Sequence, residues 1–199
     1  MLHIRKNVER LNFYGTEFVV NICYKYHLMK RLLLIIVPLI LSSCSAGYLA
    51  LDPVDEFEIE KYMGKWYEIS RLPNDYQRGL EENTQIYSFD QKGDILVVLE
   101  GRVIEDKSKI KQGKLKAWIP DKKQPGKLKL SYTWPFSTDL WILKVDKDYN
   151  YALIGEPSGE SLWIIARDRK PDSKVILQLK DYARDLGFPV EYMISCISD

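Results

Sequence analysis

Histidine is nearly absent from this chain, and its positions decide which chemistry can be excluded. The two histidines, His3 and His27, both precede a run of apolar residues near the N-terminus. From residue 44 onward the sequence therefore offers no Ser-His-Asp or Cys-His arrangement and no histidine ligand for a metal. We accordingly expect no catalytic residue, no metal site and no cofactor in the mature protein.

Cysteine is also scarce, with Cys23, Cys44 and Cys196 at widely separated positions. They form no C-x-x-C pair and no even set of the kind that frames a small disulfide-rich protein. The net charge is only +1, and no basic patch stands out that would hold phosphates. The sequence therefore gives no sign of a nucleic-acid partner.

One apolar run interrupts the polar N-terminal region. Residues 32–41 read LLLIIVPLIL, follow two basic residues, and precede two serines and Cys44. This order of basic, apolar and small residues is typical of a signal peptide, and the run is shorter than the roughly 20 residues that cross a bilayer. We predict a signal peptide over 29–43. Residues 1–28 are then an over-long gene start, with a genuine N-terminal extension as the alternative.

The end of this signal resembles the lipobox of bacterial lipoproteins, reading Leu-Ser-Ser-Cys over 41–44 with Ser45 next. In that family the cysteine receives a diacylglycerol, the chain is cut before it, and the new amine is acylated. The resemblance implies lipidation at Cys44, a lipidated tether over 44–56, and an anchor in the outer membrane facing the periplasm. Several acyl chains hold a protein on a membrane far more firmly than one does. An ordinary signal with a chance cysteine is the alternative.

Short β-rich segments separated by turn signals follow the tether and a helical turn at 57–63. Evenly spaced strands of this kind are typical of a β-sandwich or an up-and-down barrel. Apolar residues at helical spacing then predict one helix between Pro171 and Gly187. A last short strand is predicted at 190–195. The barrel strands are predicted near 66–71, 84–90, 95–104, 109–118, 127–133, 140–146, 150–156 and 161–167.

Three motifs occur in order along this pattern. A Gly-x-Trp motif at Gly64 and Trp66 opens the first strand, Asp146 lies in a turn after the sixth, and Arg167 ends the eighth. Together they resemble the lipocalin family, in particular its bacterial and apolipoprotein D-like members. The resemblance implies an all-β fold over 57–199: an eight-stranded antiparallel up-and-down barrel with one C-terminal α-helix packed outside. It also implies structural roles for the motif residues, with Arg167 lying over Trp66.

A barrel of eight strands is wide enough for one small ligand, and alternate residues of each strand face its interior. In related lipocalins the positions similar to Tyr87, Leu99 and Trp141 face inward, and this register predicts an apolar lining. Near the first loop, Arg71 and Arg78 are predicted to meet an anionic head group. The alternative for each residue is a filled core or a solvated surface. The predicted ligand contacts in the strands are Tyr87, Val97, Leu99, Leu115, Leu130, Tyr132, Trp141 and Leu143, and the same register brings in Gln85, Ala117 and Leu128.

The resemblance implies that the protein binds, stores or transports a fatty acid or lysophospholipid in the cell envelope. Close relatives often have an asparagine where this chain has Leu99, so we expect a drier cavity and a more apolar ligand than usual. The sequence does not identify the ligand, and it leaves open whether the protein is a homodimer.

Two other functions compete with this interpretation. One is a lipocalin-fold enzyme acting on a lipid, with Cys196 as nucleophile; against it, Cys196 has no histidine to activate it, and Glu68, Asp90 and Glu100 lack any visible pairing. The other is a structural envelope lipoprotein without ligand. In that case we expect the barrel to be filled by Trp118, Trp134 and Trp141.

Overall fold

The computed structural model describes residues 49–197. The predicted gene start (1–28), the predicted signal peptide (29–43) and Cys44 lie outside the described residues. Between residues 49 and 197, no helix is long and apolar enough to cross a bilayer. The same residues include no group of His, Cys, Asp and Glu placed to hold a metal ion.

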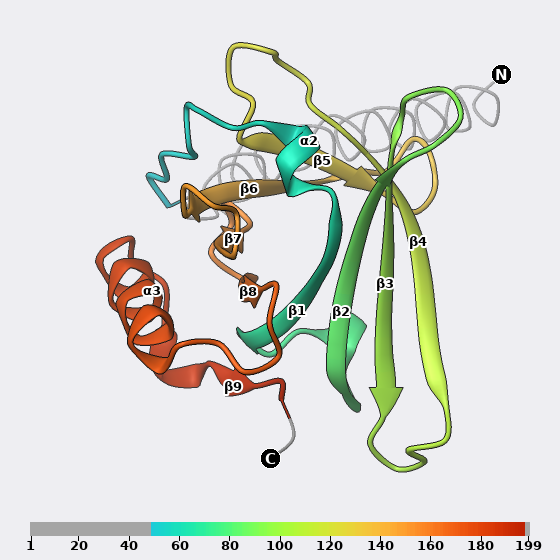
Figure 1. The fold of residues 1–199 in the computed structure, drawn as a ribbon, viewed down its shortest axis with the longest axis vertical. Coiled ribbons are helices and arrows are strands. Elements are labelled where there is room, and N and C mark those ends of the chain that lie inside the picture. Colours follow the sequence, from blue (N-terminus) through green and yellow to red (C-terminus); the bar gives the residue numbers. More distant parts are fainter. Residues whose placement is uncertain (1–48, 198–199) are drawn as a thin grey trace, which may run out of the picture. The chain divides into compact units, whose positions relative to one another are not determined.

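The described residues form a closed antiparallel barrel (Figure 1). Neighbouring strands follow the chain order from β2 to β8, and β1 closes the ring by pairing with both β8 and β2. The prediction of an eight-stranded up-and-down barrel is therefore confirmed. The strands are β1 (Gly64–Arg71), β2 (Leu80–Phe89), β3 (Ile95–Val103), β4 (Ile110–Trp118), β5 (Lys127–Ser131), β6 (Thr138–Val145), β7 (Tyr151–Gly155) and β8 (Leu162–Ala166), and a short β9 (Ile194–Ser195) pairs with the end of β1.

One long helix packs outside the barrel, as predicted. Its N-cap is Asp172, whose side chain accepts a hydrogen bond from the backbone N–H of Lys174 at 2.8 Å. After the helix, Gly187 adopts a φ of +92°, a left-handed conformation that glycine adopts readily and that ends helices. The helices are α2 (Ile59–Tyr62), α3 (Ser173–Asp185) and the 3₁₀ turns η1 (Asp75–Gln77) and η2 (Val190–Tyr192).

Two hydrophobic clusters hold these elements together. One fills the barrel interior around Trp66 and Tyr87, and the other lies between the barrel wall and α3 around Leu179 and Ala183. Strand β8 separates the two clusters, and all five of its residues are buried. A strand covered on both faces carries no alternation of apolar and polar residues, so its sequence does not reveal which side chains point inward.

The two ends of the barrel differ in what they carry. The connections β1–β2, β3–β4, β5–β6 and β7–β8 lie at one end, here called the mouth end, because consecutive antiparallel strands alternate in direction. The opposite end carries α2, which leads into β1, and is here called the closed end.

Residues 49–57, here called the strap, run along the barrel from the mouth end to the closed end. The backbone N–H of Leu49 donates to the carbonyl of Pro157 in the β7–β8 turn at 3.0 Å. Further along, the N–H of Val54 donates to the carbonyl of Ile142 at 2.9 Å, and Phe57 is buried in the interior cluster. The part of the predicted tether that the structure describes, 49–56, is thus packed on the folded domain.

Candidate functional site

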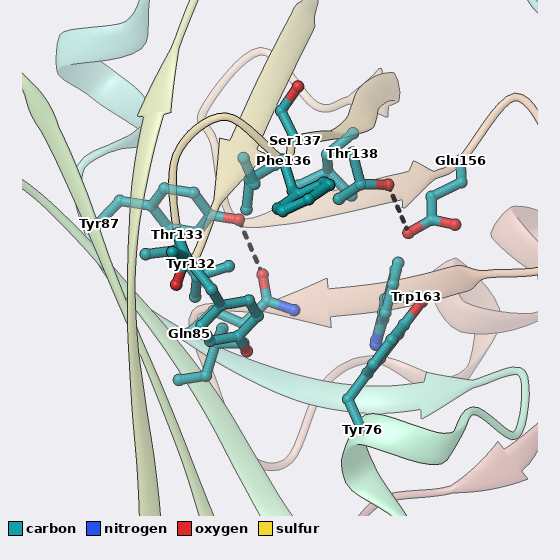
Figure 2. A pocket seen from close by; sticks show the side chains of 14 residues that line it. Tyr76, Gln85, Tyr87, Tyr132, Thr133, Phe136, Ser137, Thr138, Glu156 and Trp163 are labelled. Atoms are coloured by element: carbon teal, nitrogen blue, oxygen red, sulfur yellow. Dashed lines mark hydrogen bonds between the residues drawn. The ribbon is translucent and has the colours of Figure 1, made fainter.

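A cavity of about 410 Å³ lies inside the barrel and opens at the mouth end (Figure 2). This volume falls within the range of roughly 300–1,000 Å³ typical of small-molecule sites. The mouth-end loops and six of the strands contribute the lining residues, which are mostly apolar or aromatic. They are Tyr76, Gln85, Tyr87, Leu99, Leu115, Leu130, Tyr132, Thr133, Phe136, Ser137, Thr138, Leu140, Glu156 and Trp163.

The polar atoms next to the cavity are largely paired with one another. The Tyr87 hydroxyl donates to Gln85 Oε1 at 2.8 Å (Figure 2), and Gln85 Nε2 donates to Glu68 Oε1 at 2.8 Å. The Trp163 indole N–H donates to Gln77 Oε1 at 3.0 Å. Because these groups satisfy each other, the surface left for a ligand is mainly hydrocarbon.

Buried Glu68 is the centre of this polar group. The side chain of Gln77 donates to both carboxylate oxygens, at 2.8 and 2.7 Å. Burial raises the pKa of the Glu68 carboxyl, whereas the amide donors of Gln85 and Gln77 and the positive charge of Arg71 act in the opposite direction. Glu68 does not line the cavity, so its geometry fits a structural hydrogen-bond centre rather than a reacting group.

The mouth of the cavity carries one carboxylate. Glu156 lies at the rim, where Thr138 Oγ1 donates to its Oε1 at 3.4 Å (Figure 2). Partial burial raises the pKa of this carboxyl above its ordinary value. Aromatic side chains of Tyr76, Tyr132 and Phe136 surround the same opening. An apolar tail can therefore enter the cavity while a polar group stays near Glu156.

Five of the predicted contacts line this cavity: Tyr87, Leu99, Leu115, Leu130 and Tyr132. Val97 also faces the interior and is fully buried there, but it belongs to the packed cluster and not to the cavity wall. The same holds for Ala117 and Leu128, whereas Gln85 does line the cavity.

The prediction that Trp141 and Leu143 point inward is wrong. Both belong to the outer cluster beneath α3, and the ammonium of Lys127 lies 4.3 Å from the centre of the Trp141 ring. Their neighbours Leu140 and Ile142 face the interior instead. Strand β6 is apolar on both faces because one face packs inside the barrel and the other beneath α3. A register error of one residue, which exchanges the two faces, is therefore invisible in its sequence.

The two arginines predicted at the head-group site do not line the cavity either. Arg71 is buried, and its guanidinium donates to the backbone carbonyls of Leu72 at 3.4 Å and Gln77 at 3.0 Å. Arg78 is exposed and pairs with Asp75 within the first loop. Neither guanidinium is therefore placed on the cavity wall, where it could bind an anionic head group.

Several lining residues were not predicted from the sequence. Tyr76, Phe136 and Glu156 come from loops or strand ends, where the strand alternation gives no prediction. Leu140 shares the inward face with Leu128, its partner across β5 and β6, but this pairing is a feature of the fold that the sequence of β6 alone does not reveal.

The closed end is tightly packed. Trp66 is fully buried, and its indole N–H donates to the carbonyl of Tyr62 at 2.8 Å. The guanidinium of Arg167 lies 3.8 Å from the centre of the Trp66 ring. The same guanidinium donates to the backbone carbonyls of Lys61, Tyr62, Met63, Lys65 and Tyr149.

Gly64 and Asp146 complete the motif residues. Gly64 has a φ of +101°, and a Cβ there would lie 3.2 Å from Arg167 Nη1, so a larger residue would be strained and would crowd the guanidinium. Asp146 Oδ1 accepts from the backbone N–H groups of Asn150 at 2.7 Å and Tyr151 at 2.6 Å, which fixes the β6–β7 turn. None of the four motif residues lines the cavity.

Residues 57–197 match the family model described as a lipocalin-like domain. The chain belongs to the lipocalin family. Among relatives, it is 29% identical to the outer membrane lipoprotein Blc of Vibrio cholerae, over 83% of this chain and 97% of that protein. The corresponding protein of Escherichia coli K12 is 30% identical over 71% of this chain and 79% of its own length. Apolipoprotein D of Bos taurus is 28% identical over 71% and 77%.

Solved lipocalin structures share the fold. Insecticyanin of Manduca sexta superimposes with a TM-score of 0.61 at 19% identity, covering 77% of this chain and 87% of that one. At this identity the likeness supports the architecture alone.

Two features of this lipocalin bear on the competing functions. Cys196 is buried outside the cavity, and burial raises the pKa of its thiol to about 12. A nucleophilic cysteine needs a lowered pKa instead, because the thiolate is the reactive form. Trp118 and Trp134 are exposed and Trp141 packs against the outer cluster, so these three side chains do not fill the barrel as the structural alternative requires.

Proposed function

We propose that this lipocalin is anchored to the outer membrane through a lipid on Cys44 and reversibly binds one single-chain lipid in its cavity, without catalysing a reaction. The observation that carries the proposal is the apolar cavity of about 410 Å³, whose rim carries one carboxylate, that of Glu156. Apolar walls favour an acyl chain, because each buried CH₂ contributes about 0.8 kcal/mol. The proposed ligands are the two predicted classes, a fatty acid or a lysophospholipid.

Between these two, the rim supports the lysophospholipid. The charged group beside the opening is the carboxylate of Glu156, while Arg71 and Arg78 are engaged elsewhere. A carboxylate repels the head group of a fatty acid and attracts the ammonium of a zwitterionic lysophospholipid. Leu99, which makes the wall more apolar, is compatible with either tail.

The anchor rests on the lipobox resemblance and on the reach of the sequence match. The similarity to the Vibrio lipoprotein covers 83% of this chain, more than residues 44–199 contain, so it extends into the predicted signal peptide. We expect cells supplied with labelled palmitate to label the full chain and its Cys196→Ser variant, but not Cys44→Ser. Label on the Cys44→Ser variant would contradict the anchor.

The cavity is tested by partly filling it. Leu115→Trp places a large ring against the tail, and we expect the affinity for lauroyl lysophosphatidylcholine to fall by about tenfold or more, since several CH₂ groups lose their burial. The matched control is Leu177→Trp, the same substitution at an exposed position of α3. Equal affinity of the Leu115→Trp variant and the control would contradict binding in this cavity. Native mass spectrometry of the protein purified from cells, followed by lipid extraction, then identifies the ligand class.

A further inference from the structure

The strap begins beside the mouth of the cavity. The backbone N–H of Leu49 bonds to Pro157, and the side chain of Leu49 packs over Gly159 and Gly187, where a Cβ would lie 3.2 and 3.3 Å from it. Pro157 and Gly159 belong to the β7–β8 turn, directly after Glu156 of the cavity rim. The described part of the chain therefore begins at the mouth end.

The number of residues between Cys44 and Leu49 limits how far the mouth can lie from an anchor. Cys44 is five residues before Leu49, and five extended residues span at most roughly 17 Å. Strand β2 has ten residues, which corresponds to about 33 Å. An anchor on Cys44 therefore keeps the mouth end close to the membrane, whereas the closed end lies beyond its reach.

The mouth end also presents large aromatic side chains to solvent. In the β5–β6 loop, Trp134 is 87% exposed and Phe136 is 78% exposed, and Tyr76 and Tyr132 are exposed beside them. Tryptophan and tyrosine favour the head-group level of a bilayer, where the ring is partly buried and its polar atom stays hydrated. The nearby charges of Asp75 and Arg78 neutralise each other, so the contact does not depend on anionic lipid.

We propose that the mouth end docks on the phospholipid bilayer, with Trp134 inserted at the head-group level. The cavity then opens onto the membrane, and a single-chain lipid passes between bilayer and cavity without crossing water. The orientation rests on the proposed lipidation of Cys44, while the exposed aromatic loop supports docking independently of it. The occupant of this surface is the bilayer itself.

The test compares exposed tryptophans at the two ends. Trp134 lies at the mouth end, and the half-exposed Trp118 ends β4 at the closed end. The unit Gly47–Asp199 is compact and contains the whole barrel, so it can be studied without the signal peptide. With phosphatidylcholine vesicles, we expect Trp134→Ser to weaken partitioning by about tenfold, the effect of withdrawing one large ring from an apolar surface. Trp118→Ser is the matched control and should partition as the unsubstituted protein does.

A second readout locates the inserted ring. With bromine on the lipid acyl chains, tryptophan fluorescence is quenched only at contact with the bilayer. Quenching should be lost in Trp134→Phe and kept in Trp118→Phe, both in the soluble unit and in the lipidated full chain reconstituted in the same vesicles. Quenching that depends on Trp118 would mean that the closed end faces the membrane, which overturns the proposal.

The remaining outcomes separate docking from the proposed function. Normal lysophospholipid binding with no vesicle partitioning would overturn docking and leave the ligand proposal standing. Vesicle partitioning by a protein whose cavity binds no lipid would support docking and overturn the ligand proposal. A dimer in sedimentation that Trp134→Ser dissociates, in a protein that does not bind vesicles, would assign the aromatic loop to a second copy of this chain and overturn docking.

Discussion

The closed end and the mouth end of this barrel use aromatic residues in opposite ways. At the closed end Trp66 and Tyr62 are fully buried, and Arg167 donates to five backbone carbonyls around them. At the mouth end, Trp134 and Phe136 extend into solvent, and a cavity remains open behind them. The buried aromatic residues of the closed end stabilise the fold, whereas the exposed aromatic residues of the mouth end are available to contact another molecule.

This division separates stability from binding along a single barrel. Residues that seal the closed end should change the free energy of unfolding and leave ligand affinity almost unchanged. Substitutions at the mouth end should change ligand affinity and leave the free energy of unfolding almost unchanged. The reason is that these side chains are already exposed in the folded protein. Four substitutions test whether the two ends are as independent as the structure indicates.

The largest effect is expected for Trp66→Ala. Removing a fully buried tryptophan leaves a hole among Tyr62, Tyr87 and Arg167, and such changes typically lower the free energy of unfolding by about 3–5 kcal/mol. Urea unfolding measures it, with the exposed Trp134→Ala as control at less than about 0.5 kcal/mol. Lysophospholipid affinity of the folded protein should stay within about twofold; a parallel loss of affinity would show that the two ends are coupled.

Arg167→Lys should have the next largest effect. A lysine cannot lie flat on the indole, and its three donors cannot replace the fork that reaches Lys61, Met63, Lys65 and Tyr149. We expect the free energy of unfolding to fall by about 1–3 kcal/mol as carbonyls lose their partners. Arg184→Lys is the matched control, an exposed arginine of α3 that pairs with Asp181. Equal effects of the two substitutions would mean that the stacked geometry contributes nothing.

The sequence predicts the closed end better than the mouth end, for a physical reason. The barrel and its helix follow from strand spacing, turn signals and a capped helix, all of which are local. The closed-end residues Gly64, Trp66 and Arg167 also belong to short motifs at strand ends. The mouth loops carry no such signal, so Tyr76, Phe136 and Glu156 were not predicted.

Register inside the wall was predicted most directly where one face of a strand is polar. In β4, charged residues alternate with Leu115 and Ala117, and the inward face was assigned correctly. In β6 both faces are apolar, since α3 covers the outer one, and Trp141 was assigned to the wrong side. The covering helix is a tertiary feature that the alternation of a single strand does not contain.

Gly126→Ala tests whether the strap is held along the barrel. A Cβ at Gly126 would lie 2.5 Å from the backbone oxygen of Val54, so the strap must move away locally. We expect a loss of about 1 kcal/mol in unfolding free energy, of the order of one backbone hydrogen bond. Proteolysis within residues 49–57 should be faster as well. In the control Gly113→Ala, the Cβ meets only the movable side chain of Tyr132 at 3.3 Å. Unchanged cleavage would mean that the strap does not depend on this contact.

The smallest effect is expected at the rim, from Glu156. Partial burial raises its pKa, so the carboxyl stays neutral to a higher pH than usual and becomes charged as the pH rises through the raised value. Affinity for an alkylsulfonate, which stays anionic throughout, should then fall about two- to threefold, because the half-exposed charge is screened. Affinity for lysophosphatidylcholine should rise over the same interval, since the new carboxylate attracts the ammonium.

Glu156→Gln should make both of these pH profiles flat. Glu160→Gln removes a neighbouring carboxylate outside the cavity lining and should keep both slopes, moving them only to lower pH because the charge of Glu160 helps to raise the pKa of Glu156. The opposite slopes matter more than their size. A change in the packing of the barrel with pH would move both affinities in the same direction, whereas a single carboxylate beside the head group must move them apart. Parallel profiles, or profiles that persist in Glu156→Gln, would therefore remove Glu156 from the head-group site and with it the reason for preferring a lysophospholipid over a fatty acid.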